Sequence, residues 1–172
     1  MSSKKFERGF MERFLIALDC QTDCEKIIDY MVRVLKGTQD CEFKILHILA
    51  TASPDKLRME EVQRIEHMHA GRPDLAGYFW KKEDEKIMER CFVQAREKLV
   101  IGGFRPESVL FLFAVQSGDM AEIIHAKAAE LGCSTIVLGR RRPSLVKQLL
   151  VGSVSTSVFK SARGSAVWVI EI

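Results

Sequence analysis

Two glycines and a group of hydroxyl side chains near the end of the chain have a spacing that points to phosphate binding. In STIVLGRRRPSLVKQLLVGSV (134–154), a buried-strand pattern ends at Gly139, and Gly152 and Ser153 follow a stretch without glycine. Glycine lets a backbone approach a ligand without a Cβ in the way. A helix starting near Gly152 would offer free amides, a positive dipole end and the hydroxyls of Ser153 and Ser155. The segment therefore predicts a phosphate site.

The elements that must position these residues follow from the apolar patterning. Short apolar runs alternate with stretches of helical periodicity, and short connections between them favour parallel strands. We therefore expect an α/β fold with a doubly wound parallel sheet and helices on both faces. The predicted strands are 13–19, 41–50, 108–116, 133–139 and 165–172, and the predicted helices are 22–36, 81–103, 118–132 and 149–162.

Helix ends are marked by capping residues. Thr22 or Asp23 is expected to cap the first helix and Gly37 to end it, while Asp119 caps a later helix. In parallel sheets of this kind, ligands bind beyond the carboxyl ends of the strands. Asp19 ends the first predicted strand and Gly139 the fourth, so both would face one crevice if these strands are neighbours.

The chain has the size and composition of one globular domain. It has 172 residues, of which 47% are hydrophobic and 28% charged, and we expect a single domain over residues 1–172. Residues 51–80 contain two prolines and two glycines and predict a short helix around 55–69 within an irregular excursion over the sheet edge or the binding face.

Charge and cysteine usage restrict the function classes. A net charge of +3 is too mild to indicate nucleic acid or an anionic membrane. The apolar run Phe14–Leu18 is five residues long, too short for a secretory signal or a membrane helix. Five scattered cysteines suit a reducing compartment better than a disulfide framework, so a cytoplasmic location is expected.

The whole pattern resembles the nucleotide-binding universal stress proteins. Residues 139–153 follow the signature G-x2-G-x9-G-[ST] of that family except at its second glycine, and FLIALD, LHIL and GDMAEIIHAKAAELGCSTIVLG extend the likeness over nearly the whole chain. The resemblance implies a five-stranded sheet of order 3-2-1-4-5, usually in a dimer. It also implies binding of ATP or AMP, with or without Mg²⁺, and no catalytic chemistry of its own.

Carried over by position, the resemblance assigns the residues of a nucleotide site. Asp19 and Ile48 would border the adenine, and Leu138 and Gly139 would line the ribose-phosphate side. The phosphates would be held by Gly152, Ser153 and Val154. Ala17 and Ser155, the latter as a hydroxyl donor, complete the expected cofactor-binding residues together with Arg142.

Arg142 departs from the family signature, which has a glycine there. Its side chain could fill the phosphate space, point outward, or reach a phosphate bidentately, because guanidinium suits that geometry. Pro143 restricts Arg142 to extended conformations. If the arginine closes the pocket, the chain would instead be a dimeric adaptor without nucleotide, and 140–142 only a solvated basic turn.

Other candidate sites are weaker. Cys20 and Cys24 could supply two zinc ligands, but the sequence has no second cysteine pair to complete the site. Cys20 could instead be a reactive thiol, because it lies near the start of a helix. His47 is expected to be packed and hydrogen-bonded, and His125 to be on the surface or lightly packed. No hydrolase elbow, P-loop or dinucleotide fingerprint is present, so an enzyme is the weakest hypothesis.

The last predicted strand indicates how the chain assembles. SAVWVIEI (165–172) would be an apolar strand at a sheet edge, where bare backbone promotes aggregation. Pairing with a second copy across a two-fold axis would remove that hazard. The sequence therefore predicts a homodimer through this strand.

Overall fold

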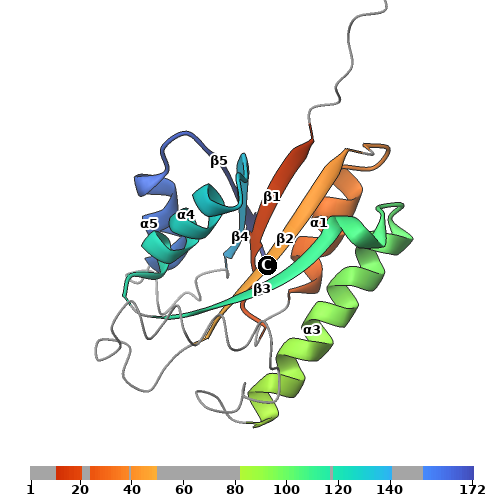
Figure 1. The fold of residues 1–172 in the computed structure, drawn as a ribbon, viewed down its shortest axis with the longest axis horizontal. Coiled ribbons are helices and arrows are strands. Elements are labelled where there is room, and N and C mark those ends of the chain that lie inside the picture. The colour runs from red at the N-terminus through yellow and green to blue at the C-terminus, as the bar shows by residue number, and fades with distance from the viewer. Residues whose placement is uncertain (1–10, 21–23, 39, 50–81, 117, 141–152) are drawn as a thin grey trace, which may run out of the picture.

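A parallel five-stranded sheet forms the centre of the computed structural model, in the order β3-β2-β1-β4-β5 (Figure 1). The structure describes residues 11–20, 24–38, 40–49, 82–116, 118–140 and 153–172. The predicted class, strand order and parallel direction are confirmed. The strands are β1 (Glu12–Ala17), β2 (Cys41–Leu49), β3 (Val109–Val115), β4 (Thr135–Arg140) and β5 (Ala166–Glu171), and the helices are α1 (Glu25–Val34), α3 (Lys82–Ile101), α4 (Met120–Glu130) and α5 (Ser153–Ser161).

Helices cover both faces of the sheet, as expected. Figure 1 shows α1 and α3 on one side and α4 and α5 on the other. Strand β1 lies at the centre, and its consecutive residues Leu15 and Ile16 are both fully buried, each on a different face. A strand covered on both faces needs the continuous apolar run that the sequence shows here.

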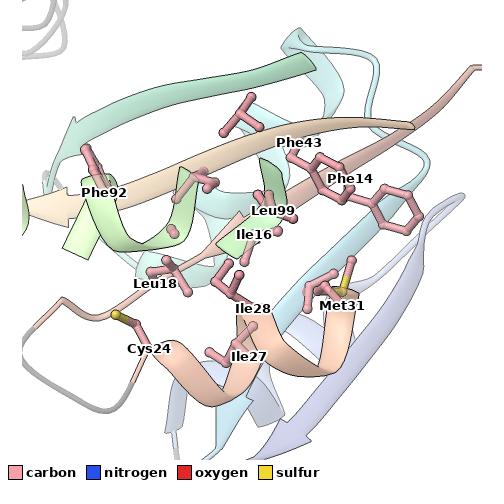
Figure 2. Close-up of a cluster of buried hydrophobic side chains, with 14 of the residues drawn as sticks. Phe14, Ile16, Leu18, Cys24, Ile27, Ile28, Met31, Phe43, Phe92 and Leu99 are labelled. Atoms are coloured by element: carbon pink, nitrogen blue, oxygen red, sulfur yellow. The ribbon is translucent and has the colours of Figure 1, made fainter. Parts of the chain in front are cut away.

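The first core lies between the sheet and helices α1 and α3 (Figure 2). Phe14 of β1 stacks on Phe43 of β2, with ring centroids 5.8 Å apart, and Phe43 meets Phe104 edge to face at 4.8 Å. Helix α1 adds Ile28 and Met31, which are both inaccessible to solvent. Together these side chains pack α1 and α3 against one face of the sheet.

The second core lies between the sheet and helices α4 and α5. Leu15, Ile136 and Leu138 come from the strands, Ile124 comes from α4 and Val158 from α5, and each is at most 3% exposed. Because this core joins the start and end of α5 to β4, it determines where the first turn of α5 lies.

Most expected helix ends are confirmed. Asp119 caps α4 by accepting a hydrogen bond from the backbone N–H of Ala121 at 2.9 Å, and Gly37 follows α1 with φ at +88°. The expected cap of α1 is wrong. The helix begins at Glu25, about one turn later than predicted, and its N-cap is Cys24, whose side chain makes no capping hydrogen bond.

A short 3-10 helix at Pro106–Ser108 was not predicted; Pro106 supplies the fixed φ of its first helical position. The excursion predicted at 51–80, with its short helix around 55–69, lies outside the described residues.

Candidate functional site

The carboxyl ends of β1 and β4 lie side by side, as a shared crevice requires. Ala17 of β1 is the direct cross-strand partner of Leu138 of β4. Both side chains belong to the second core, and Ile48 of β2 packs against the same cluster. The structure therefore brings three of the predicted site residues to one face of the sheet at its carboxyl edge.

Hydrogen bonds from β2 fix the end of β1 just before Asp19. The N–H of Leu18 donates to the carbonyl of Leu46 at 2.9 Å, and Nδ1 of His47 lies 3.0 Å from the carbonyl oxygen of Leu18. Because a carbonyl oxygen can only accept, Nδ1 carries the proton. Asp19 follows at once and is exposed, so its carboxylate is held at the carboxyl edge of the sheet.

The first turn of α5 reaches the same edge. Strand β4 ends at this edge and β5 begins at the opposite one, so α5, which precedes β5, runs away from it. Val154, in that first turn, packs against the cluster that contains Ala17, Ile48 and Leu138. The amino end of a helix, with its free N–H groups, therefore lies beside the ends of β1 and β4.

The structure describes only some of the residues that were predicted to contact phosphate. Ser155 is 8% exposed, so its side chain is buried and not on an open surface. Ser153 is the first residue of α5. Arg142 and Gly152 lie outside the described residues.

Gly139 has a packing reason to be glycine. A Cβ at this position would lie 2.7 Å from Cδ1 of Ile27 and 3.2 Å from Cδ1 of Ile172. The space that we expected to admit a ligand is therefore taken on this side by α1 and the last residue of the chain. A glycine within a strand often marks such a close approach.

His125 of α4 anchors the far end of α5. Its Nε2 lies 3.0 Å from the carbonyl oxygen of Val158 and donates to it. Val158 is in the last turn of α5, where carbonyls lack a partner within the helix. His125, which was expected to be on the surface or lightly packed, therefore satisfies one of these carbonyls and holds α5 in place.

Sequence reasoning missed the supporting roles of three side chains. His47 was expected to be packed and hydrogen-bonded, which is confirmed, but the residue that it holds was not foreseen. Ile27 and His125 act across helices far apart in the sequence, on β4 and α5 respectively. Only a three-dimensional arrangement could reveal these partners.

The cysteines are free thiols and all five are buried. Cys20 is 6% exposed, whereas reactive thiols are usually accessible. Among the described residues, no group of three or more His, Cys, Asp or Glu side chains is arranged to hold a metal ion. Within the same residues, no helix has the length and apolar character needed to cross a membrane.

Comparison with known proteins identifies the family. The family model for the universal stress protein family matches residues 11–170. The chain belongs to the universal stress protein family. It is 31% identical over 147 residues to the universal stress protein YxiE of Bacillus subtilis (strain 168), a match that covers 85% of this chain and 90% of YxiE.

Solved universal stress protein structures share the fold. A universal stress protein from Archaeoglobus fulgidus superposes with a TM-score of 0.63 at 17% identity, covering 94% of this chain and 99% of that one. A structure of the universal stress protein from the same organism, in complex with dAMP, has a TM-score of 0.58 at 17% identity and covers 92% and 97% of the two chains. These similarities confirm the Rossmann-like α/β architecture.

Replacing Gly139 by alanine should destabilise this universal stress protein, because the new methyl group must displace the buried end of Ile27. We expect a loss of about 1–2 kcal/mol in the free energy of unfolding, measured by urea denaturation. Gly118→Ala is the control, since nothing lies within 4 Å of a Cβ there. Equal stability of the two variants would contradict this account of Gly139.

Removing the His47 side-chain donor should also destabilise the fold, because the carbonyl of Leu18 loses its bond from Nδ1. His47→Leu is expected to cost about 1–3 kcal/mol in urea unfolding. His47→Asn places an N–H near the position of Nδ1 and should restore most of that loss. If asparagine is no better than leucine, the bond does not hold the end of β1.

Proposed function

We propose that this universal stress protein binds an adenine nucleotide, ATP or AMP, at the carboxyl ends of β1 and β4 and acts as a cytoplasmic stress-response regulator. The observation that carries the proposal is that Ala17, Ile48 and Val154 all pack against the second core, which contains Leu138. This cluster brings an apolar floor and the amino end of a helix to one edge of a parallel sheet, where ligands of such folds bind.

In this proposal the two ends of the nucleotide contact different elements. Asp19 and Ile48, with Ala17, border the adenine, and Leu138 and Gly139 run along the ribose. Asp19 suits this place because its exposed carboxylate can accept hydrogen bonds from hydroxyl or amino groups.

The phosphates would lie at the start of α5. Backbone N–H groups of a helix end are free to bind an anion, and the helix dipole favours negative charge there. Gly152, Ser153 and Val154 would contact the phosphates, with Mg²⁺ accompanying ATP. Ser155, which is buried, would support the turn from within.

Support also comes from the relative in complex with dAMP, which is an adenine nucleotide. It shares the architecture with this chain at 17% identity, so it supports the kind of ligand and not the individual contacts. Arg142 has two possible effects on this site: its guanidinium binds a phosphate, or it occupies the phosphate space.

A second candidate function is a dimeric adaptor without nucleotide. Strand β5 pairs only with β4 among the described strands, and Val169 on it is 41% exposed. Such an edge is suited to pairing with a second copy. The dimer is compatible with both functions. We take residues 1–172 as one domain. In the adaptor, the excursion at 51–80 is the segment that would contact a protein partner.

Calorimetric titration of nucleotide-free protein with Mg-ATP and with AMP tests the proposal. We expect binding in the micromolar range. Asp19→Ala should weaken it by about ten- to a hundredfold, because it removes a charged acceptor. Asp40→Ala, which removes an exposed carboxylate at the opposite edge of the sheet, should leave affinity unchanged.

Arg142→Gly distinguishes the two functions in the same titration. Weaker binding in this variant shows that the arginine contacts phosphate. Binding gained only in the variant shows a pocket closed by Arg142 and favours the adaptor. The nucleotide proposal fails if neither protein binds.

The dimer is tested by light scattering after gel filtration. Val169→Lys places a charge on the β5 edge and should yield a monomer. Leu110→Lys is the matched control, because Leu110 is 44% exposed on β3, the other edge strand. A dimer that survives Val169→Lys but not Leu110→Lys would place the interface at the wrong edge.

A further inference from the structure

Three buried cysteines meet beside the end of β1. Cys20 follows β1, Cys24 is the N-cap of α1, and Cys91 lies in the middle of α3. The Sγ atoms of Cys24 and Cys91 are 2.8 Å apart, although 67 positions separate them in the sequence. The Cys91 thiol also interacts with Cys20. Figure 2 shows Cys24 at the start of α1, in the first core.

We propose that Cys24 and Cys91 are a dithiol–disulfide site, which a hydroperoxide oxidises to a covalent bond between α1 and α3. A disulfide has an S–S length of about 2.05 Å, so the two sulfur atoms need to approach by only about 0.8 Å. The inference is independent of nucleotide binding, because it concerns only the chemistry of these thiols.

The packing of α1 on α3 holds the two sulfurs in place. Lys98 on α3 forms an ion pair with Asp29 on α1, in which Nζ lies 2.6 Å from Oδ1. Near the end of α3, Gly102 lies so close to Val32 that a Cβ there would be 2.6 Å from its Cγ1. A polar and an apolar contact thus hold α1 against α3, and in this packing the two sulfur atoms lie 2.8 Å apart.

The oxidation balances with two thiols and one hydroperoxide. One sulfur attacks the peroxide oxygen, the O–O bond breaks, and a sulfenic acid and water (or an alcohol) are produced. The second sulfur then attacks the sulfenic sulfur, the S–S bond forms, and a water leaves. The thiols lose two electrons and two protons, and the peroxide is reduced.

The surroundings of the thiols favour slow oxidation by the hydroperoxide and a disulfide that is stable once formed. Hydrogen bonding to Cys20, together with burial, raises the pKa of the Cys91 thiol to about 12. Hydrogen bonding to Cys91 and burial also raise the pKa of Cys24. Because attack needs a thiolate, oxidation is slow. Because the thiolates are not stabilised, the reduced state gains no advantage over the disulfide, unlike in strongly oxidising dithiols.

Cys20 supplies a third thiol next to the pair. Its sulfur can attack the disulfide at Cys91, release Cys24 as a thiol and form a Cys20–Cys91 bond by exchange. Cys91 is therefore the common member of both bonds, and only one of them exists at a time.

The test is oxidation of the full-length protein with hydrogen peroxide, followed by denaturation, alkylation of remaining thiols and peptide mapping. We expect the wild-type protein to lose two of its five thiols together and to yield a peptide that joins Cys24 and Cys91. Dithiothreitol should restore five thiols. The bond closes a long loop, so the Tm should rise by about 5–15 °C.

Variants distinguish this site from general oxidation. Cys91→Ala should abolish the cross-link and the rise in Tm, while Cys24→Ala should leave only a Cys20–Cys91 bond. Cys133→Ala, which removes a buried cysteine of the second core, is the control and should oxidise like the wild type. The proposal is overturned if peroxide leaves five alkylatable thiols, produces only sulfinic acids, or forms only disulfides that do not include Cys91.

Discussion

Burial of β1 on both faces is the constraint on which the structure depends. Leu15 and Ile16 are neighbours in sequence, yet each belongs to a different hydrophobic core, and both are inaccessible to solvent. A central strand of this kind requires helices on both sides of the sheet, and right-handed crossovers then place β2 and β4 beside it. The same strand ends at Asp19, so the arrangement of the cores also determines where the candidate site lies.

The two edges of the sheet have different roles because of this arrangement. At the amino edge, Arg13 and Lys44 both lie 3.2 Å from the carboxylate of Glu42, so both basic side chains form ion pairs with Glu42. At the carboxyl edge, Asp19 follows a strand end held by His47, and the first turn of α5 lies beside it. A proposed ligand therefore meets preorganised groups at one edge only, and the three thiols lie at that same end of β1.

Much of the fold could be predicted from sequence, because buried parallel strands and amphipathic helices have strong patterns. The strands at 133–139 and 165–172 were correct to within two residues at each end. Ends that depend on loop geometry were less predictable, since polar side chains at 22 and 23 indicated a cap although α1 starts at Glu25. The glycine signature did not reveal that Ile27 packs where a Cβ of Gly139 would lie, and the meeting of Cys24 with Cys91 depends on helix packing that no local pattern encodes.

The central claim is that an adenine nucleotide binds where β1, β4 and the start of α5 meet. The most direct measurement is an amide ¹H–¹⁵N spectrum of isotope-labelled protein recorded during titration with ATP. The account predicts shifts that are concentrated at Asp19, Gly139 and Val154, with the amides of Glu42 and Ala166 at the amino edge unchanged. Shifts confined to the amino edge, or a spectrum that ATP leaves unaltered, would contradict it.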